Sequence, residues 1–449
     1  MLLEDFASGK VLLQKGCGVF VEDASGKRYL DAIGGVGAVN IGHGVPEILS
    51  AIEHQAGRLA FSYGHRIDNE PRAALGERIQ RWVPQGMGQT RTLFCSGGAE
   101  ANEAAIKLTV QYHRERGSER KTRFISRWQS YHGNTLGALS LSGRTQWRQD
   151  FEPLLCAFPH IQPPYCYRCP YGRSYPGCDL ACALELERVI HQVGPMNVAG
   201  FVAEPVIGTS MSAVVPPPEY YPLIRQICDQ YDVLLIVDEV MSGFGRTGKR
   251  FGIDHWAVSP DIITVAKGIS GGYSPLAAAI LSEPMWRTFA EGSGRVQHSY
   301  TYGGNPLSCA IGVAVLDYIE RHSLIERAKD VGEALIRSLR DSLMDLPHVG
   351  DVRGKGLFIG VELVADRPSK RPFAPDLRVA ERVVDEAFVR GLLVLDGVTG
   401  NLDGVAGDHF EILPPYTIED EHCEFIVRTI HESVEAGCKG LRESSKRSP

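Results

Sequence analysis

The fold is decided by the stretch Asp238-Glu239-Val240-Met241-Ser242-Gly243-Phe244-Gly245-Arg246-Thr247-Gly248, which begins where the apolar run 233–237 ends. A second apolar run, 261–266, leads to Lys267. The tail of the stretch, Gly243 to Gly248, also has the glycine spacing of a dinucleotide-binding turn. Two kinds of cofactor therefore compete for the same residues, and the flanking sequence has to distinguish between them.

The dinucleotide interpretation requires a helix directly after the glycines, because the helix N-terminus faces the pyrophosphate, and an acidic residue about 20 positions further on. Asp261 satisfies the second requirement. The first requirement fails, because residues 249–253 are followed closely by Pro260 and leave no room for an amphipathic helix. A nicotinamide-dependent oxidoreductase therefore stays only a remote alternative.

Asp238 and Lys267 favour a different cofactor. Asp238 ends a buried strand, at the edge where α/β proteins bind ligands, and a carboxylate there is costly unless it meets a cation or hydrogen-bond donors. A protonated pyridine nitrogen is both. A partly buried lysine such as Lys267 can lose its proton near neutral pH and attack an aldehyde. Each residue alone is equally typical of a salt bridge at a strand end, and it is their paired placement that indicates a cofactor site.

Short apolar runs alternate with helical periodicity through the middle of the chain. The runs that we expect to be strands are 91–95, 123–126, 200–206, 233–237, 262–266 and 276–281. Apolar strands separated by helices predict an α/β fold, with a mostly parallel sheet covered by helices on both faces. The last third alternates again and predicts a smaller α+β lobe beside an N-terminal hairpin at 18–31.

Composition bounds the class of protein. The chain has 449 residues, of which 43% are hydrophobic and 22% charged, as in ordinary globular proteins. Its formal charge of −7 argues against nucleic-acid binding, which needs a basic face. The N-terminus lacks the pattern of a signal peptide and no run is long enough to span a bilayer, so we expect a cytoplasmic protein without a membrane partner.

Four of the 11 cysteines crowd together as Cys166-x2-Cys169-x8-Cys178-x3-Cys182. In a reducing compartment such crowding suggests metal before disulfide. The spacing departs from common zinc patterns, however, and prolines and tyrosines in the same segment indicate a packed irregular loop. We therefore expect structural thiols and no metal, and a metal-binding module stays a remote alternative.

The chain resembles the class III aminotransferases, pyridoxal-phosphate enzymes of fold type I. The matching motifs run in order from Gly18-Val19-Phe20-Val21-Glu22-Asp23 and Ile41-Gly42-His43-Gly44 to Leu413-Pro414-Pro415. The resemblance implies that Lys267 forms a Schiff base with pyridoxal 5′-phosphate and that Asp238 keeps the pyridine nitrogen protonated. It also implies a large domain with a mostly parallel, seven-stranded type of sheet at 51–315 and a smaller domain from 1–50 and 316–449.

The activity implied is that of an ω-type transaminase. An amino group passes from an amine or ω-amino acid to a keto acid such as pyruvate by a ping-pong mechanism through aldimine and ketimine. A decarboxylase or an aminomutase on the same fold stays an alternative, because the cofactor residues do not decide which bond breaks.

Further motifs resemble the family's cofactor pocket. Ser96-Gly97-Gly98-Ala99-Glu100-Ala101-Asn102-Glu103 opens a helix whose free N–H groups suit a phosphate, and with Ala99 in place of the usual hydroxyl the contact is through backbone only. Tyr131-His132-Gly133 matches the motif whose aromatic residue stacks on the pyridine ring, and Val240 matches the residue on the opposite face. Glu204 matches a glutamate that pairs with a mobile arginine in several branches.

Thr301 matches the threonine that reaches the phosphate of the neighbouring subunit. The resemblance therefore implies a homodimer with shared active sites, and assembly into a tetramer stays open.

The chain departs from the family at the residue that binds a substrate carboxylate. Two branches place an arginine where this chain has Glu411 or Gly404, and neither can bind a carboxylate by a fork of donors. Glu204 then lacks its usual partner. Two explanations stay open. Another cation binds the carboxylate, the candidates being Arg66, Arg72 and Arg144; or the donor is an amine or long ω-amino acid held at a mouth lined by Phe61, Tyr63 and Tyr131.

Overall fold

The apolar runs of the middle of the chain form a central seven-stranded sheet in the computed structural model, which describes residues 11–62, 64, 66–397 and 399–441. The strand order is β4-β10-β9-β8-β7-β5-β6. The strands are β4 (Arg91–Cys95), β5 (Arg123–Arg127), β6 (His160–Ile161), β7 (Val198–Ala203), β8 (Leu234–Asp238), β9 (Ile262–Val265) and β10 (Ala277–Leu281). Only β10 runs antiparallel to its neighbours, so the predicted mostly parallel α/β sheet is confirmed.

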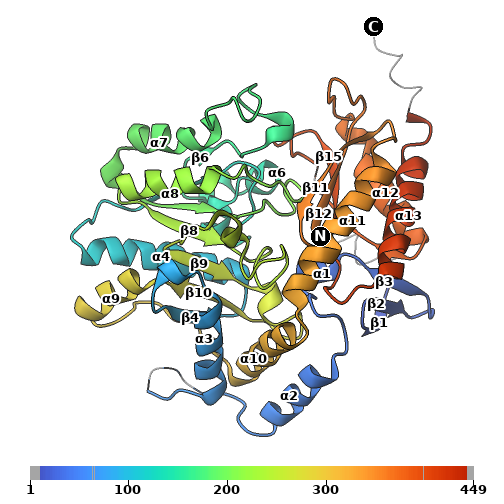
Figure 1. Cartoon of the computed structure of the whole chain (residues 1–449). Coiled ribbons are helices and arrows are strands. Elements are labelled where there is room, and N and C mark those ends of the chain that lie inside the picture. The colour runs from blue at the N-terminus through green and yellow to red at the C-terminus, as the bar shows by residue number, and fades with distance from the viewer. Residues whose placement is uncertain (1–10, 63, 65, 398, 442–449) are drawn as a thin grey trace.

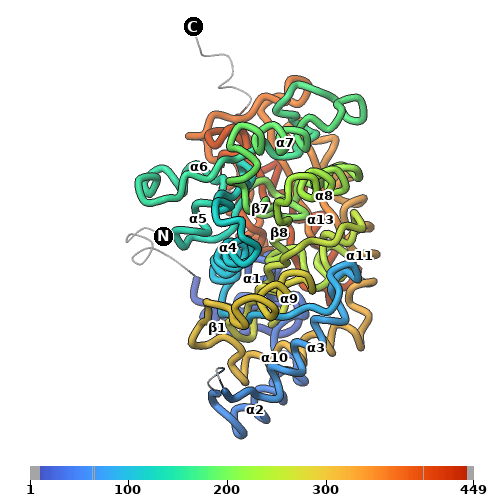
Figure 2. Tube along the Cα trace, turned by 90° about the vertical axis from the view of Figure 1, so that its left-hand side faces the viewer, coloured from blue at the N-terminus to red at the C-terminus, as the bar shows by residue number. Residues whose placement is uncertain are grey.

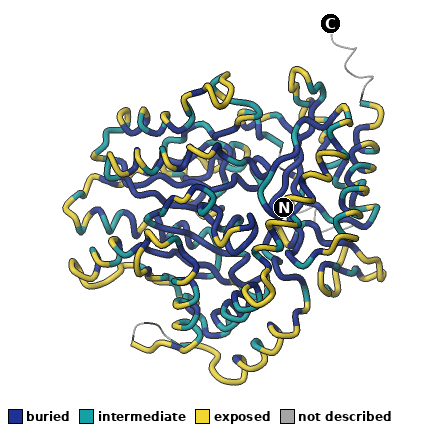
Figure 3. The backbone as a smooth tube through the Cα atoms, viewed as in Figure 1, coloured by how far each residue is buried: buried dark blue, intermediate teal, exposed yellow. Residues whose placement is uncertain are grey.

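Helices cover both faces of this sheet. Successive residues of β8 alternate between two hydrophobic clusters: Leu235 and Val237 in one, Leu234 and Ile236 in the other. The first cluster includes residues of α7 (Ala181–Val193) and α8 (Tyr220–Gln230), and the second includes residues of α4 (Gly98–Glu115) and α9 (Glu283–Glu291). Figure 1 shows the strands among their helices, the turned view of Figure 2 shows α4 and α8 on opposite sides of β7 and β8, and Figure 3 shows the buried strands between more exposed helices.

The N-terminal hairpin lies beside the C-terminal part of the chain (Figure 1). β1 (Leu13–Cys17), β2 (Phe20–Asp23) and β3 (Arg28–Asp31) form a sheet whose fourth strand is β13 (Leu392–Leu393). Asp23 accepts hydrogen bonds at the predicted turn from the backbone N–H of Ser25 at 2.8 Å and of Lys27 at 3.1 Å. β13 pairs in parallel with β3, so segments from the two ends of the sequence share one sheet.

A third sheet, in the order β11-β12-β15-β14, forms the C-terminal lobe with α11 (Leu324–Leu343), α12 (Val379–Val389) and α13 (Asp420–Gly437). Its strands are β11 (Val349–Lys355), β12 (Phe358–Leu363), β14 (Leu395–Asp396) and β15 (Asp408–Ile412). β11 and β12 are consecutive and pair antiparallel. The turn between them contains Gly356, where φ is +55° and an added Cβ would lie 2.5 Å from the carbonyl carbon of Thr247.

The connecting helices lie along the lower edge of the molecule in Figure 1. Figure 2 shows α2 (Pro46–Ala56) and α3 (Glu70–Trp82) beside α10 (Pro306–Arg321), which links the two parts of the fold. Asn305 caps α10 by accepting from the N–H groups of Leu307 and Ser308 at 3.0 and 3.2 Å. The other short helices are α1 (Gly34–Gly37), α5 (Leu136–Leu141) and α6 (Thr145–Arg148). Within the described ranges, no helix has the length and apolar character needed to cross a bilayer.

The glycine-rich loop at 243–248 is a turn that joins the two parts of the fold. No α-helix follows it before β9, as the sequence predicts. The fully buried Arg246 in this loop donates from Nη1 to the carbonyl oxygens of Leu357 at 3.1 Å and Pro414 at 2.5 Å, and its guanidinium lies over the ring of Tyr416. The glycines thus shape a structural turn and do not form a dinucleotide site.

Candidate active site

A cavity of about 330 Å³ lies at the carboxyl ends of β8 and β9. Most of the predicted site residues line it: Gly98, Ala99, Tyr131, His132, Glu204, Asp238, Val240 and Lys267. Parallel strands end at the same edge of the sheet, which is why residues far apart in sequence meet here.

Asp238 is the last residue of β8 and is 3% exposed. Its Oδ2 accepts from Nδ2 of Asn102 and lies 2.8 Å from Nδ1 of His132, and its Oδ1 accepts from the backbone N–H of Val240 at 3.0 Å. Thr264 in turn donates to Oδ1 of Asn102 at 2.8 Å. The carboxylate is therefore held in one orientation as an acceptor by three donors, which offsets the cost of its burial.

Lys267 follows β9 and borders the cavity with a left-handed backbone, φ +46°. Burial lowers the pKa of its amine to about 8, against the opposing effect of the carboxylates of Glu411 and Asp238. A substantial fraction of Lys267 is therefore neutral near pH 8. A neutral amine is the form that can attack a carbonyl carbon or accept a proton.

The first turn of α4 borders the cavity with Gly98 and Ala99, after the N-cap residue Gly97. The N–H groups at a helix start have no partner within the helix and attract anions. Gly98 is needed for packing, because a Cβ added there would lie 2.9 Å from Cγ2 of Val240. Gly133 is likewise too close to its neighbour for a side chain, since a Cβ added there would lie 2.6 Å from the Cβ of Ala99.

Tyr131 borders the cavity and contacts a buried cation. Its ring packs edge-on against Trp147, with 5.4 Å between centroids. The guanidinium carbon of Arg144 lies 4.3 Å from the Trp147 ring and 5.6 Å from the Tyr131 ring. Arg144 is buried, and its Nη2 donates to the carbonyl oxygen of Thr209, another cavity residue, at 3.3 Å. Its Nε has no hydrogen-bond partner among the residues that the structure describes.

Glu204 has a partner that the sequence did not reveal. Its Oε2 lies 3.4 Å from Nη2 of Arg127, a fully buried residue at the end of β5, and its Oε1 accepts from the N–H of Tyr131 at 3.3 Å. Arg127 also donates to the carbonyl oxygen of Glu204 at 2.6 Å. Glu204 therefore has an arginine partner from β5, whereas the absence of its usual mobile arginine stays a prediction.

The two positions that depart from the family differ in their surroundings. Gly404 has φ +77°, and an added Cβ there would lie 2.3 Å from Oγ1 of Thr145, so no long side chain fits without a shift. Glu411 is fully buried on β15, and neither of its oxygens has a hydrogen-bond partner within the described part of the chain. Burial raises the pKa of Glu411 to about 8, although Lys267, Arg144 and Arg353 oppose the shift.

Of the three arginines considered for a substrate carboxylate, Arg144 contacts cavity residues. Arg66 is exposed, and Arg72 forms an ion pair with Asp68 at 2.9 Å. Phe61 and Thr301 are not among the residues that border the cavity of their own chain. Phe61 is 40% exposed and packs edge-on against Tyr302, and Thr301 is also exposed. Tyr63 lies outside the described residues.

The four crowded cysteines lie in the loop before α7. Cys166 is exposed, Cys178 is buried, and Cys169 and Cys182 are intermediate. The loop is tied to β12 by Arg168, whose Nε donates to Oε1 of Glu362 at 2.7 Å. No three of these sulfurs lie within 4.8 Å of one another, and this part of the chain stays predicted to carry structural thiols.

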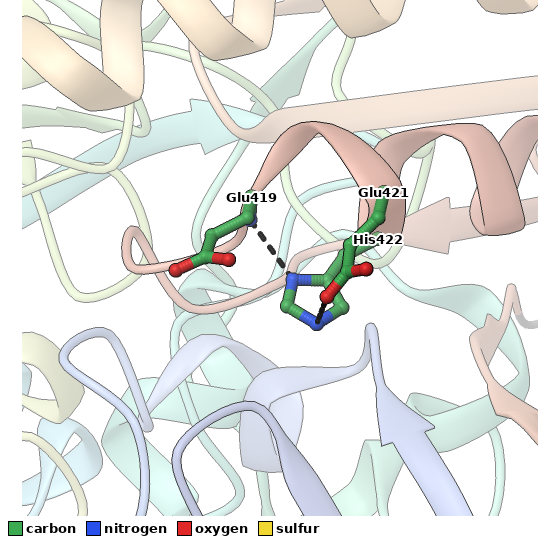
Figure 4. A group of neighbouring side chains, drawn as sticks. All are labelled: Glu419, Glu421 and His422. Carbon is green, nitrogen blue, oxygen red and sulfur yellow. Dashed lines mark hydrogen bonds and ion pairs between the residues drawn. The ribbon is translucent and has the colours of Figure 1, made fainter.

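Over the described ranges, one group of three potential metal ligands lies within 4.8 Å, namely Glu419, Glu421 and His422 (Figure 4). His422 Nδ1 accepts from the N–H of Glu419 at 2.9 Å, and its Nε2 lies 3.7 Å from Glu421. These contacts cap the start of α13, with Glu419 as the N-cap residue. Glu419 takes that role because its side chain and that of His422 satisfy each other's N–H groups.

The residues bordering the cavity fit pyridoxal phosphate. Free N–H groups at the start of α4 suit its phosphate, the Asp238 carboxylate suits its protonated ring nitrogen, and the Lys267 amine suits its aldehyde. Val240 and Tyr131 offer apolar and aromatic contacts for a flat ring.

Asn102 and Arg127 are residues whose roles the sequence reasoning missed. Asn102 belongs to the motif that predicted the start of a helix for the phosphate. Its polar side chain on the buried side of that helix was the signal that could have indicated a role in the site. Arg127 ends a predicted strand, but nothing in the sequence joins it to Glu204.

Comparison with known proteins shows that the chain and its fold match a known family. The model of the family Aminotransferase class-III matches residues 6–434. The chain is 37% identical over 443 residues to the uncharacterized aminotransferase YodT of Bacillus subtilis, covering 99% of each.

Two solved structures resemble the chain closely. An (S)-enantioselective omega-transaminase from Thermomicrobium roseum has a TM-score of 0.90 and 35% identity, covering 97% of this chain and 95% of that one. An amine transaminase from an uncultivated Pseudomonas species, in a PLP-bound internal aldimine form, has a TM-score of 0.88 and 34% identity, covering 96% and 95%.

Proposed function

The chain belongs to the class III aminotransferases, which use pyridoxal 5′-phosphate to move an amino group from a donor to a keto acid, and we propose that its donor is an amine or an ω-amino acid and its acceptor a keto acid such as pyruvate. The main support is that Lys267, with its pKa lowered to about 8, borders the same cavity as Asp238. A reactive amine and a firmly held carboxylate are the two groups that this cofactor requires at opposite ends.

In this proposal the N–H groups of Gly98 and Ala99 bind the phosphate, Asp238 accepts a hydrogen bond from the ring nitrogen, and Tyr131 and Val240 contact the two faces of the ring. Bound there, the cofactor supplies an aldehyde for the amino group and a ring that withdraws electrons from the reacting carbon. The donors to Asp238 from Asn102, His132 and Val240 keep the carboxylate oriented.

Lys267 acts as the base of the reaction. Its Nζ, once released by the incoming donor, takes the proton from the donor carbon that carries the amine and later returns a proton to the acceptor carbon. A single group at this place avoids recruiting a second base, and a pKa near 8 suits proton transfer in both directions at neutral to mildly alkaline pH.

Arg144 binds the carboxylate of the keto acid. It is buried, it contacts two residues of the cavity wall, Tyr131 and Thr209, and its Nε has no partner within the described part of the chain. A guanidinium with a free N–H edge can bind a carboxylate with two parallel hydrogen bonds. Glu204 is held by Arg127 and is not available to neutralise Arg144 by direct contact.

A homodimer with shared active sites supplies Thr301. Thr301 and Tyr302 are exposed, and Tyr302 together with Phe61 forms an apolar surface pair. Mixed dimers test this arrangement. Lys267→Ala and Thr301→Ala subunits, each impaired alone, should recover activity on mixing, because one of the two sites in a hybrid is then intact. Absence of recovery in hybrids of verified composition would contradict shared sites.

The function is tested with the cofactor-loaded protein and a panel of amino donors, using pyruvate and 2-oxoglutarate as acceptors. We expect consumption of a keto acid with at least one donor, and its loss in Lys267→Ala, while the exposed Lys249→Ala control keeps its activity. A protein that folds and binds the cofactor but transfers no amino group in any pairing would contradict the proposal. The domain boundaries at 50/51 and 315/316 and the cytoplasmic location stay predictions.

A further inference from the structure

Among the described residues, Glu411 is a buried acid without a hydrogen-bond partner. It is 0% exposed, and both Oε1 and Oε2 lack hydrogen-bond partners within the described ranges. An ionised carboxylate in such surroundings is destabilised by several kcal/mol, on the order expected for an unpaired buried charge, unless a cation or donors approach it. A group of this kind indicates a binding position more strongly than a packing role.

Glu411 is not itself one of the residues that border the cavity, but the strand that carries it lies beside a loop that borders it. In a strand, alternate residues share a face, so Glu411 and His409 of β15 point the same way. His409 Nδ1 contacts Oγ of Ser212, in the loop whose first residues Gly208 and Thr209 border the cavity. Gly360, the partner of Glu411 on β12, also faces this loop, because an added Cβ there would meet the carbonyl oxygen of Ser212.

The nearby cations are either paired elsewhere or at the cavity. Arg353 donates to Glu362 at 2.8 Å and to Asp351 at 3.0 Å. Lys267 and Arg144 remain. Burial lowers the pKa of both residues, and the charge of Glu411 is the largest influence that raises them. Neither lies within 4.0 Å of Glu411 among the described residues, so Glu411 influences the cavity without an ion pair of its own.

We propose that Glu411 binds a second ammonium group at the far end of the amino donor, so that the donor is a diamine or a diamino acid. One amine of such a donor reacts beside Lys267 while the other is held by the Glu411 carboxylate. The proposal rests on the transaminase function proposed above and narrows its donor class. A donor that ends in a carboxylate would instead meet repulsion and an uncompensated buried acid at this place.

Proton linkage gives the proposal a specific pH dependence. The charged groups that face Glu411 are Lys267, Arg144 and Arg353, which lower its pKa, and Glu204, which raises it; Asp396 of the neighbouring β14 acts on Arg144. With its pKa raised to about 8, Glu411 must lose a proton when an ammonium binds below that pH. Affinity for the diamine should therefore rise from pH 7 to about 8.5 more steeply than affinity for a monoamine.

Three amino donors with four carbons each differ in the group at the end far from the reacting amine: 1,4-diaminobutane, 1-aminobutane and 4-aminobutanoate. Each is assayed with the cofactor-loaded enzyme and the same saturating keto acid. Because a charge-assisted hydrogen bond contributes about 1.5–3 kcal/mol, we expect kcat/KM for the diamine to exceed that for the monoamine by about tenfold to a hundredfold. 4-Aminobutanoate should be the poorest of the three.

Variants at Glu411 then test whether this residue causes the preference for the diamine over the monoamine. Glu411→Gln should reduce the ratio of diamine to monoamine by about tenfold or more, and Glu411→Arg should favour 4-aminobutanoate over the diamine. The exposed Glu424→Gln control on α13 should leave the ratio unchanged. Thermal unfolding verifies that each variant is folded. An equal loss for diamine and monoamine in Glu411→Gln would mean that Glu411 acts through Arg144 or the fold, and would overturn the proposal.

A binding measurement separates this proposal from the transaminase function. Calorimetric titration of cofactor-loaded Lys267→Ala, which lacks the reacting amine, compares 1,4-diaminobutane with 1-aminobutane directly. We expect tighter binding of the diamine, and loss of the difference in Lys267→Ala/Glu411→Gln. Equal binding overturns the role of Glu411 even if transamination is observed. Tighter diamine binding without transamination by the intact enzyme supports the site while contradicting the reaction.

Discussion

Asn102 donates from Nδ2 to Oδ2 of Asp238 over 2.8 Å, and the same nitrogen donates to the carbonyl oxygen of His132 over 2.7 Å. The hydroxyl of Thr264 donates to the other end of the amide, which fixes the nitrogen toward the carboxylate. One amide thus joins α4, the loop at Tyr131-His132 and strands β8 and β9. We infer that Asn102 is a positioning residue for Asp238.

Replacement of Asn102 by Ala should lower kcat by about tenfold to a hundredfold while KM for the donor changes by less than about threefold, because the buried carboxylate loses one of its three donors. The absorption spectrum of the bound cofactor should also change, since the ring nitrogen responds to the carboxylate that faces it. Asn134→Ala, an exposed asparagine of the same loop as His132, is the matched control. An unchanged spectrum with reduced thermal stability would indicate a structural role alone.

Arg144→Met should raise KM for pyruvate by about tenfold to a hundredfold, the loss expected for a charge-assisted hydrogen bond to a carboxylate. The rate of the first half-reaction, in which a monoamine donor reacts without a keto acid, should fall by less than about threefold. Stopped-flow spectroscopy separates the two halves. Arg66→Met, at an exposed site, should behave like wild type. A raised KM for pyruvate in Arg66→Met and not in Arg144→Met would assign the carboxylate to Arg66.

The activity should increase with pH through about 8. Lys267 accepts a proton only when its amine is neutral, and burial lowers its pKa to about 8, so protonation inactivates the base below that value. We expect kcat to fall about tenfold per pH unit well below pH 8 and to level off above it. A profile from pH 6 to 9.5 checks this. A profile in which kcat rises only near pH 10, the usual pKa range of a lysine, would contradict the burial of the amine.

Gly98→Ala should weaken cofactor binding, because the new Cβ would lie 2.9 Å from Cγ2 of Val240 at the first turn of α4. Overpacking of this kind costs about 1–3 kcal/mol, which corresponds to about fivefold to a hundredfold in the dissociation constant. The double variant Gly98→Ala/Val240→Ala creates the missing space and should recover part of the affinity. Fluorescence titration of the apoprotein measures both. Additive losses would show that the two residues are not coupled.

Asp238 and Lys267 could be assigned to one site from the sequence because each follows an apolar run, and parallel strands bring such residues to a common edge. The same reasoning predicted the α/β sheet, which is confirmed, with β10 as the antiparallel exception. The glycine spacing at 243–248 pointed to a different cofactor and was discounted correctly, since no α-helix follows it in the structure.

Other parts of the site depend on contacts that leave no local signal. Arg127 meets Glu204 because β5 and β7 are neighbours in the sheet, although 77 positions separate the two residues. The cap of α13 likewise depends on the side chains of Glu419 and His422. Glu411 stood out only as a departure from a resemblance. Its burial and lack of partners emerge when β15 is placed beside the loop at Gly208 to Ser212.

The central claim, that Lys267 carries the cofactor, is tested most directly by borohydride reduction of the loaded protein, followed by proteolysis and mass mapping. We expect one stoichiometric pyridoxyl phosphate adduct, on the peptide that contains Lys267, and none on that peptide in Lys267→Ala. An adduct on a different lysine, or no adduct in a protein that binds the cofactor, would contradict the assignment.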